Sequence, residues 1–142
     1  MASTIVDTNI LVYSHDLRDA RKQRIAAELL RRGIAKQSIG IAYQAVVEFY
    51  AAVTRRDRNN LPILDAATAA LQMEKLLEEF DVLYPNEEVI RAALHATASY
   101  QLPWFDALMW AYAATNGMTE ILSEDFQHGR LYGTVRVINP FL

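Results

Sequence analysis

Short apolar runs rich in β-branched residues alternate with helical segments along the whole chain, and this alternation constrains the fold more than any other feature. Strands that alternate with helices assemble into a mostly parallel sheet covered by helices on both faces. Five short strands are predicted, at residues 4–6, 38–41, 81–84, 119–122 and 134–138. The sequence therefore predicts an α/β protein with a central sheet of about five strands.

The segments between these strands carry the apolar spacing and the capping residues of helices. Helices are expected at residues 10–13, 18–32, 43–54, 66–80, 87–100 and 104–113. Gly33 and Gly117 are predicted to end the second and the last of them. A chain of 142 residues is long enough for one sizeable core, and no linker or repeat divides it. We therefore expect one domain, residues 1–142.

The composition excludes several classes of protein. The absence of cysteine rules out disulfides and thiolate metal sites and fits a cytoplasmic protein. No apolar run approaches the roughly 18 residues of a membrane helix. The first residues lack the basic stretch and apolar core of a signal peptide. We expect a cytoplasmic protein without a membrane segment.

The net charge of −3 argues against general affinity for nucleic acids, but the charge is unevenly distributed. Ten of the fourteen lysines and arginines precede Asn59. A locally basic face can bind phosphates even on an acidic chain. A solvated helix face is the alternative. The candidates for contact with a polynucleotide backbone are Arg18, Arg21, Arg24, Arg55, Arg56 and Arg58.

Four carboxylates lie either in apolar helical segments or just after a predicted strand, where a positively charged partner would stabilise them. Asp106 lies in an almost wholly apolar helical run, and Glu48 is flanked by Val47 and Phe49. An ionised carboxylate in apolar surroundings is costly unless something positive binds it. Asp7 and Asp125 each lie just past a predicted strand, where α/β proteins place their ligands.

Each of these acids taken alone could be a helix cap, a turn residue or part of an exposed helix face. Four carboxylates meeting at one sheet edge would repel one another strongly unless they are neutralised. A hard divalent cation such as Mg²⁺ or Mn²⁺ takes oxygen ligands and keeps waters. Sites of this kind hydrolyse phosphodiesters with a metal-activated water. The sequence thus favours a metal-dependent hydrolase.

Short blocks around the four acids resemble the signature of PIN-domain ribonucleases. Their order and the size of the chain are similar to those of VapC toxins from bacterial toxin–antitoxin pairs. The blocks are Asp7-Thr8-Asn9-Ile10-Leu11, Glu48-Phe49, Asp106-Ala107-Leu108 and Leu122-Ser123-Glu124-Asp125-Phe126.

The resemblance implies a PIN-like fold with a Mg²⁺ or Mn²⁺ site and endoribonuclease activity on single-stranded RNA. It makes Asp7, Glu48 and Asp106 the core acids and Asp125 the fourth, with Glu124 as the alternative at that position.

Small polar residues, Asn9 and Ser123, match positions that support the acids. The resemblance also implies a homodimer that a cognate VapB-like antitoxin neutralises.

Other interpretations remain open from the residues alone. A catalytically idle PIN-like module would bind RNA or a protein without cleaving. A phosphotransfer domain is less favoured, because a receiver needs a lysine after a late strand and none follows Lys75. His15 or His128 could do acid–base work. Trp104, Trp110 and Tyr112 could stack on bases, although their helical spacing favours core packing.

Overall fold

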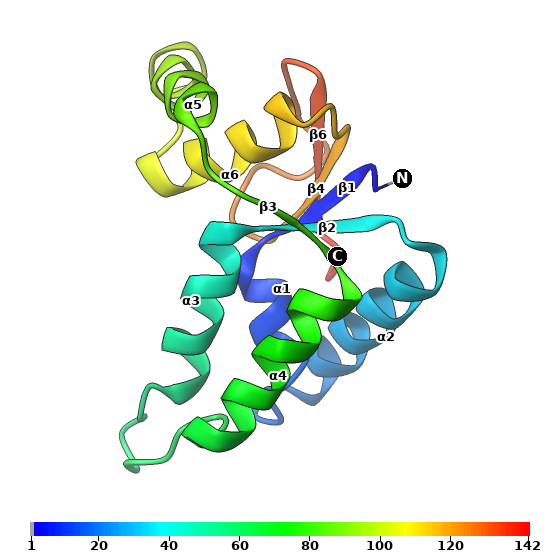
Figure 1. The fold of residues 1–142 in the computed structure, drawn as a ribbon, viewed down its shortest axis with the longest axis vertical. Helices are drawn as coiled ribbons and strands as arrows, with labels where there is room; N and C mark the ends of the chain where they lie inside the picture. Colours follow the sequence, from blue (N-terminus) through cyan, green and yellow to red (C-terminus); the bar gives the residue numbers. More distant parts are fainter. Residues whose placement is uncertain (1) are drawn as a thin grey trace.

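The computed structural model describes residues 2–142 and contains a six-stranded sheet between two groups of helices (Figure 1). The strand order is β3-β2-β1-β4-β6-β5, and within these residues only the β5–β6 pair is antiparallel. This confirms the predicted α/β class and its mostly parallel sheet. The strands are β1 (Thr4–Val6), β2 (Ile39–Ala42), β3 (Asp81–Leu83), β4 (Glu120–Leu122), β5 (Leu131–Tyr132) and β6 (Val135–Ile138).

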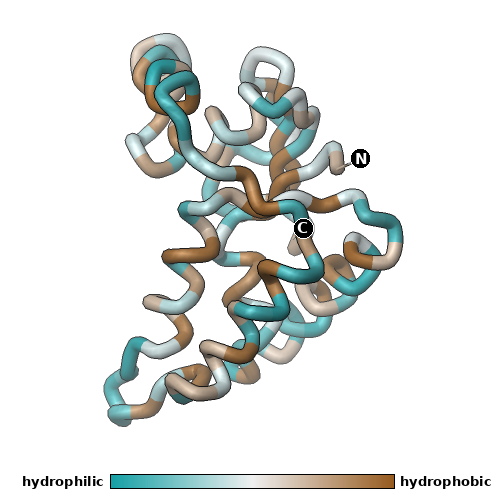
Figure 2. Tube along the Cα trace, viewed as in Figure 1, coloured by the Kyte–Doolittle hydropathy of each residue, from teal (hydrophilic) through white to brown (hydrophobic). Residues whose placement is uncertain are grey.

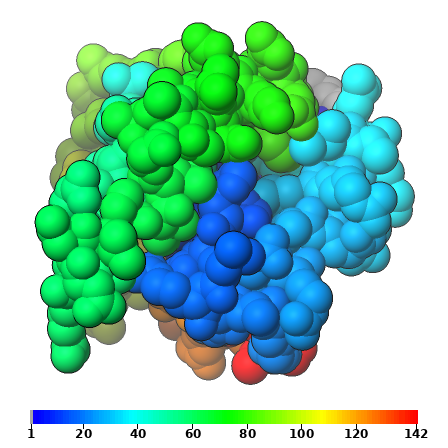
Figure 3. Space-filling model, turned by 90° about the horizontal axis from the view of Figure 1, so that it is seen from below, coloured from blue at the N-terminus to red at the C-terminus, as the bar shows by residue number. Residues whose placement is uncertain are grey.

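The helices cover both faces of the sheet, as predicted. In Figure 1 the first four lie below the strands, and the last two pack against each other above them. Seen from below, α4 and α2 flank the segment that follows α1 (Figure 3). The helices are α1 (Thr8–Tyr13), α2 (Ala20–Lys36), α3 (Tyr43–Thr54), α4 (Ala66–Glu79), α5 (Glu87–Ser99) and α6 (Trp104–Thr115).

The central strands form the middle of the hydrophobic core. Ile5, Ile41 and Ile121 are fully buried, as expected for strands covered on both faces. Polar residues gather instead at the tip between α3 and α4, which is teal at the lower left of Figure 2. Within residues 2–142, no helix combines the length and apolar character needed to cross a bilayer.

The strand order brings two distant loops together. β1 lies between β2 and β4, and Val6 is in register with Leu122. The backbone N–H of Asp7 donates to the carbonyl of Leu122 at 2.9 Å. The residues after β1 and after β4 therefore leave the sheet side by side at its carboxyl edge, where open α/β sheets bind ligands.

Gly33 does not end α2, contrary to the prediction from sequence. The helix continues to Lys36, and Gln37 adopts the left-handed conformation after it with φ of 52°. A Cβ at position 33 would overlap the side chain of Ile39 on β2. The glycine allows the helix to approach the strand closely, a role that a helix-stop signal does not reveal.

Gly33→Ala is expected to destabilise the protein. Overpacking a core costs about 1–3 kcal/mol, which exceeds the gain of up to about 1 kcal/mol in helix propensity. Urea unfolding should show a lower midpoint at unchanged slope. In an Ile39→Ala background the overlap disappears, so the same substitution should stabilise. Stabilisation in the wild-type background would contradict this packing.

The structure has one strand more than the five predicted. β5 pairs with β6 across a two-residue turn between Tyr132 and Val135, and Gly133 takes φ of 62° in that turn. The indole N–H of Trp110 donates to the carbonyl of Tyr132 at 2.9 Å. A two-residue strand carries no periodicity in sequence, and the glycine in the turn is a signal that could have indicated the hairpin.

Candidate functional site

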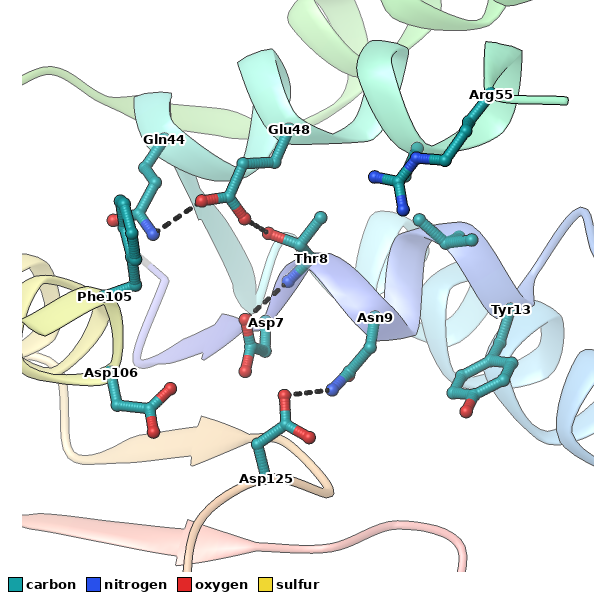
Figure 4. A pocket seen from close by; sticks show the side chains of 12 residues that line it. Asp7, Thr8, Asn9, Tyr13, Gln44, Glu48, Arg55, Phe105, Asp106 and Asp125 are labelled. Carbon is teal, nitrogen blue, oxygen red and sulfur yellow. Dashed lines mark hydrogen bonds between the residues drawn. The ribbon is translucent and has the colours of Figure 1, made fainter. Parts of the chain in front are cut away.

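The four predicted acids line one cavity of about 610 Å³ at the carboxyl edge of the sheet (Figure 4). They come from the end of β1, from α3, from α6 and from the loop after β4. The predicted supporting residue Asn9 lines the same cavity. Folding thus brings together Asp7, Glu48, Asp106 and Asp125, which are far apart in sequence.

Asp7 is the most buried of these acids, with 8% of its surface exposed. One carboxylate oxygen accepts from the backbone N–H of Thr8 at 2.7 Å, and the other accepts from the hydroxyl of Ser123 at 2.6 Å. Burial nevertheless raises the pKa of Asp7 to about 6, and the charges of Asp125 and Asp106 act in the same direction. A cation in the cavity would favour the ionised form of this carboxylate.

The negative charge of the cavity is not balanced by ion pairs. Burial, together with the charge of Asp125, raises the pKa of Asp106. Among residues 2–142, no ion pair involves any of the four acids. Among the described residues, Arg55 is the only basic side chain that lines the cavity. An added cation would therefore neutralise negative charge that the protein's own side chains leave unbalanced.

Glu48 is held by both of its oxygens (Figure 4). One accepts from the hydroxyl of Thr8 and the other from the amide of Gln44, each at 2.8 Å. Because Thr8 also binds Asp7 through its backbone, it connects two of the acids. A carboxylate whose oxygens are both engaged is well placed to contact a cation through water.

Asn9 and Ser123, the two small polar residues identified from the sequence, form hydrogen bonds with Asp125 and Asp7. The side-chain NH₂ of Asn9 donates to Asp125 at 3.0 Å, and the side-chain oxygen of Asn9 is buried and has no hydrogen-bond partner among residues 2–142. Ser123 is fully buried beneath the cavity, and its hydroxyl accepts from the backbone N–H of Asp125 at 3.1 Å. The orientation of the loop after β4 is therefore fixed relative to β1.

Glu124 does not line the cavity. Its two oxygens accept from the hydroxyl of Tyr13 at 2.5 Å and from the ammonium of Lys22 at 2.7 Å. This network ties α1 and α2 to the loop after β4. Of these two neighbouring acids, only Asp125 lines the cavity.

Of the six arginines predicted to contact RNA, only Arg55 lines the cavity. Arg18 forms ion pairs with Asp16 at 2.8 Å and Asp57 at 3.8 Å and lines a separate cavity of about 340 Å³. The structure does not place the rest at the acidic cavity: Arg21, Arg24, Arg56 and Arg58.

Several residues of the cavity were not predicted from sequence. Gln44 lies four residues before Glu48 on α3, so helical spacing could have identified it. Thr8 follows Asp7 directly. Phe105 and Tyr13 line the cavity from α6 and α1, and no local pattern distinguishes them from core aromatics.

The donors of the cavity fit a hard divalent cation. Within residues 2–142, no three acidic or histidine side chains gather closely enough to hold an ion by themselves. Mg²⁺ does not require this, because it is usually bound by one or two carboxylates together with waters and substrate oxygens. Carboxylate oxygens next to the unpartnered buried oxygen of Asn9 match that preference.

The PIN domain family model matches residues 4–133. The chain belongs to the PIN domain family. This PIN domain has the fold that the sequence blocks indicated. No curated protein matches the chain.

Solved structures of low sequence identity share the fold of this PIN domain. FitAcB from Neisseria gonorrhoeae is 16% identical with a TM-score of 0.70, covering 97% of this chain and 98% of that one. DNA-bound VapBC from Salmonella typhimurium is 11% identical with a TM-score of 0.69, covering 96% and 97%. VapC20 from Mycobacterium tuberculosis, titled a sarcin–ricin loop cleaving toxin, is 16% identical with a TM-score of 0.64, covering 87% and 90%.

Proposed function

We propose that this PIN domain is a Mg²⁺- or Mn²⁺-dependent endoribonuclease that acts as a toxin. One observation carries the proposal: four carboxylates from separate segments line one cavity, and none of them takes part in an ion pair within residues 2–142. A sheet-edge cavity with hard oxygen donors suits the hydrolysis of phosphodiesters.

The side chains of the cavity have different proposed roles. Asp7, Asp106 and Asp125 would hold the ion together with waters and substrate oxygens, and Glu48 would contact it directly or through water. When bound, a divalent ion polarises a phosphoryl oxygen and lowers the pKa of water. Ser123, Thr8 and Gln44 keep the acids in place through the hydrogen bonds described above. Arg55 neutralises a phosphate of the RNA backbone.

Cleavage of single-stranded RNA by the purified protein should require added Mg²⁺ or Mn²⁺ and stop when a chelator removes the metal. Gel analysis of tRNA, rRNA and mRNA substrates measures this. An apoprotein that cleaves at the same rate would contradict metal dependence. Intact RNA in all samples, with no metal binding by calorimetry, would indicate the idle module instead.

Glu124→Gln should cleave RNA within a few fold of the wild-type rate, because Glu124 does not line the cavity and its oxygens bind Tyr13 and Lys22. Asp125→Asn should lower the rate by more than about tenfold, since it removes a charge at the ion. Single-turnover rates measure both. The reverse ranking would assign the fourth acidic position to Glu124.

The proposal extends to the partners. Structures named as toxin–antitoxin complexes share the fold, which supports a VapB-like antitoxin that neutralises the activity in the cytoplasm. A homodimer is also proposed, because α3 exposes Tyr43, Val47 and Tyr50 at helical spacing. Light scattering of the purified chain and growth rescue by a co-expressed antitoxin test these statements.

A further inference from the structure

Phe105 has a large apolar side chain that is not packed in the hydrophobic core. It is 64% exposed, and within residues 2–142 it belongs neither to the hydrophobic core nor to the half-buried residues packed on it. Trp110 and Tyr112 on the same helix are buried. Core packing therefore explains these two aromatic residues of α6 but neither Phe105 nor Trp104, and of the last two only Phe105 lines the cavity.

The position of Phe105 links it to the acidic cavity. It lines that cavity from the first turn of α6, next to Asp106. Figure 4 shows Phe105 beside Gln44 at one end of the cavity and Arg55 at the opposite end, with Asp7 between them. An exposed aromatic ring and a cation thus stand on either side of the carboxylates.

We propose that Phe105 binds an unpaired nucleobase by stacking, next to the phosphate held at the acids. Aromatic side chains stack on the faces of bases in single strands without demanding a particular sequence. A base inside a duplex is already stacked on its neighbours, so the substrate of this site is a nucleotide splayed out of a loop or a single strand. The inference rests on the proposed ribonuclease function and makes Phe105 a positioning residue.

The test compares an RNA that has bases with one that lacks them. In the Glu48→Gln background, which slows cleavage and leaves Asp7, Asp106 and Asp125 for the ion, labelled oligouridylate of about 12 nucleotides and an abasic strand of equal length are titrated by fluorescence anisotropy with Mg²⁺ present. Phe105→Ala should weaken binding of oligouridylate by about tenfold, which is the size of one stacked base. Binding of the abasic strand should not change.

Matched variants separate stacking from other roles. Phe105→Trp should restore binding of oligouridylate, whereas Phe105→Leu, which keeps apolar bulk without a ring, should not. Tyr84→Ala removes an aromatic residue of similar exposure, 62%, that does not line the cavity, and should change neither affinity.

Equal effects of Phe105→Ala on both strands, or no effect on either, would overturn the stacking role. No effect on RNA together with a loss of dimer mass would assign Phe105 to a protein interface and also overturn it. If the protein with Phe105 intact binds neither strand, the result contradicts the proposed RNA function. The inference about Phe105 is then also wrong, because it rests on that function.

Discussion

Asp7→Asn is expected to abolish RNA cleavage and to leave the protein folded. Asp7 is the buried acid to which the other parts of the site connect, through Thr8, Ser123 and the charges of Asp106 and Asp125. Removing its charge should weaken the binding of the ion and lower the rate by more than about 100-fold, beyond the usual effect of residues that only support metal ligands.

Single-turnover cleavage of a single-stranded RNA, with growth arrest on expression in cells, measures this loss. Asp106→Asn should behave alike, because it removes a second acid from the same cavity. Glu74→Gln removes an exposed carboxylate of α4 and serves as the matched control with wild-type activity. Wild-type rates for both Asp7→Asn and Asp106→Asn would end the proposed mechanism.

The metal-free protein should lose stability as the pH rises through 6. Burial raises the pKa of Asp7 in the folded state to about 6, against an ordinary value of 3.8, so the folded state holds this proton more tightly than the unfolded state does. The stabilisation is complete below the unfolded pKa and is lost as the pH rises through the folded one. Between about pH 4.5 and 7.5 the loss is on the order of 2 kcal/mol.

Urea unfolding with a chelator present, at both pH values, measures the change. Other groups also titrate, so the useful quantity is the difference from Asp7→Asn, which lacks this titration. At the higher pH the variant should be the more stable of the two metal-free proteins. Added Mg²⁺ should stabilise the wild type at the higher pH and should not stabilise the variant. A difference that does not vary with pH would contradict the account.

Strand pattern and acid position together predicted most of the site. β1 and β4 were recognisable as apolar runs ending in Asp7 and in Ser123-Glu124-Asp125. Neighbouring parallel strands end at the same edge, so their loops meet once the strands are adjacent. The spacing of residues along the sequence does not show that β1 and β4 are neighbours in the sheet. It follows from register contacts such as that between Val6 and Leu122.

Side-chain direction was less predictable than element position. Glu48 and Asp106 were recognised by their apolar neighbours, but their convergence depends on how α3 and α6 pack on the sheet. Arg18 illustrates the limit of charge patterns, because its direction is set by Asp16 and Asp57 and not by the acidic cavity.

The role of Glu124 shows the same limit. The resemblance made Asp125 the fourth acid but left Glu124 as the alternative, and in the structure Glu124 makes a long-range contact with Lys22. Which of two neighbouring acids lines a cavity depends on contacts with side chains that are distant in sequence, and local sequence patterns do not show those contacts.

Anomalous diffraction from crystals soaked in Mn²⁺ tests most directly whether the acidic cavity is a divalent cation site. We expect a Mn²⁺ peak in contact with the carboxylate of Asp7, in the cavity lined by Asp106 and Asp125, and no peak there in Asp7→Asn crystals. A wild-type cavity without Mn²⁺ at millimolar concentrations, or an ion bound elsewhere on the chain, would contradict the account.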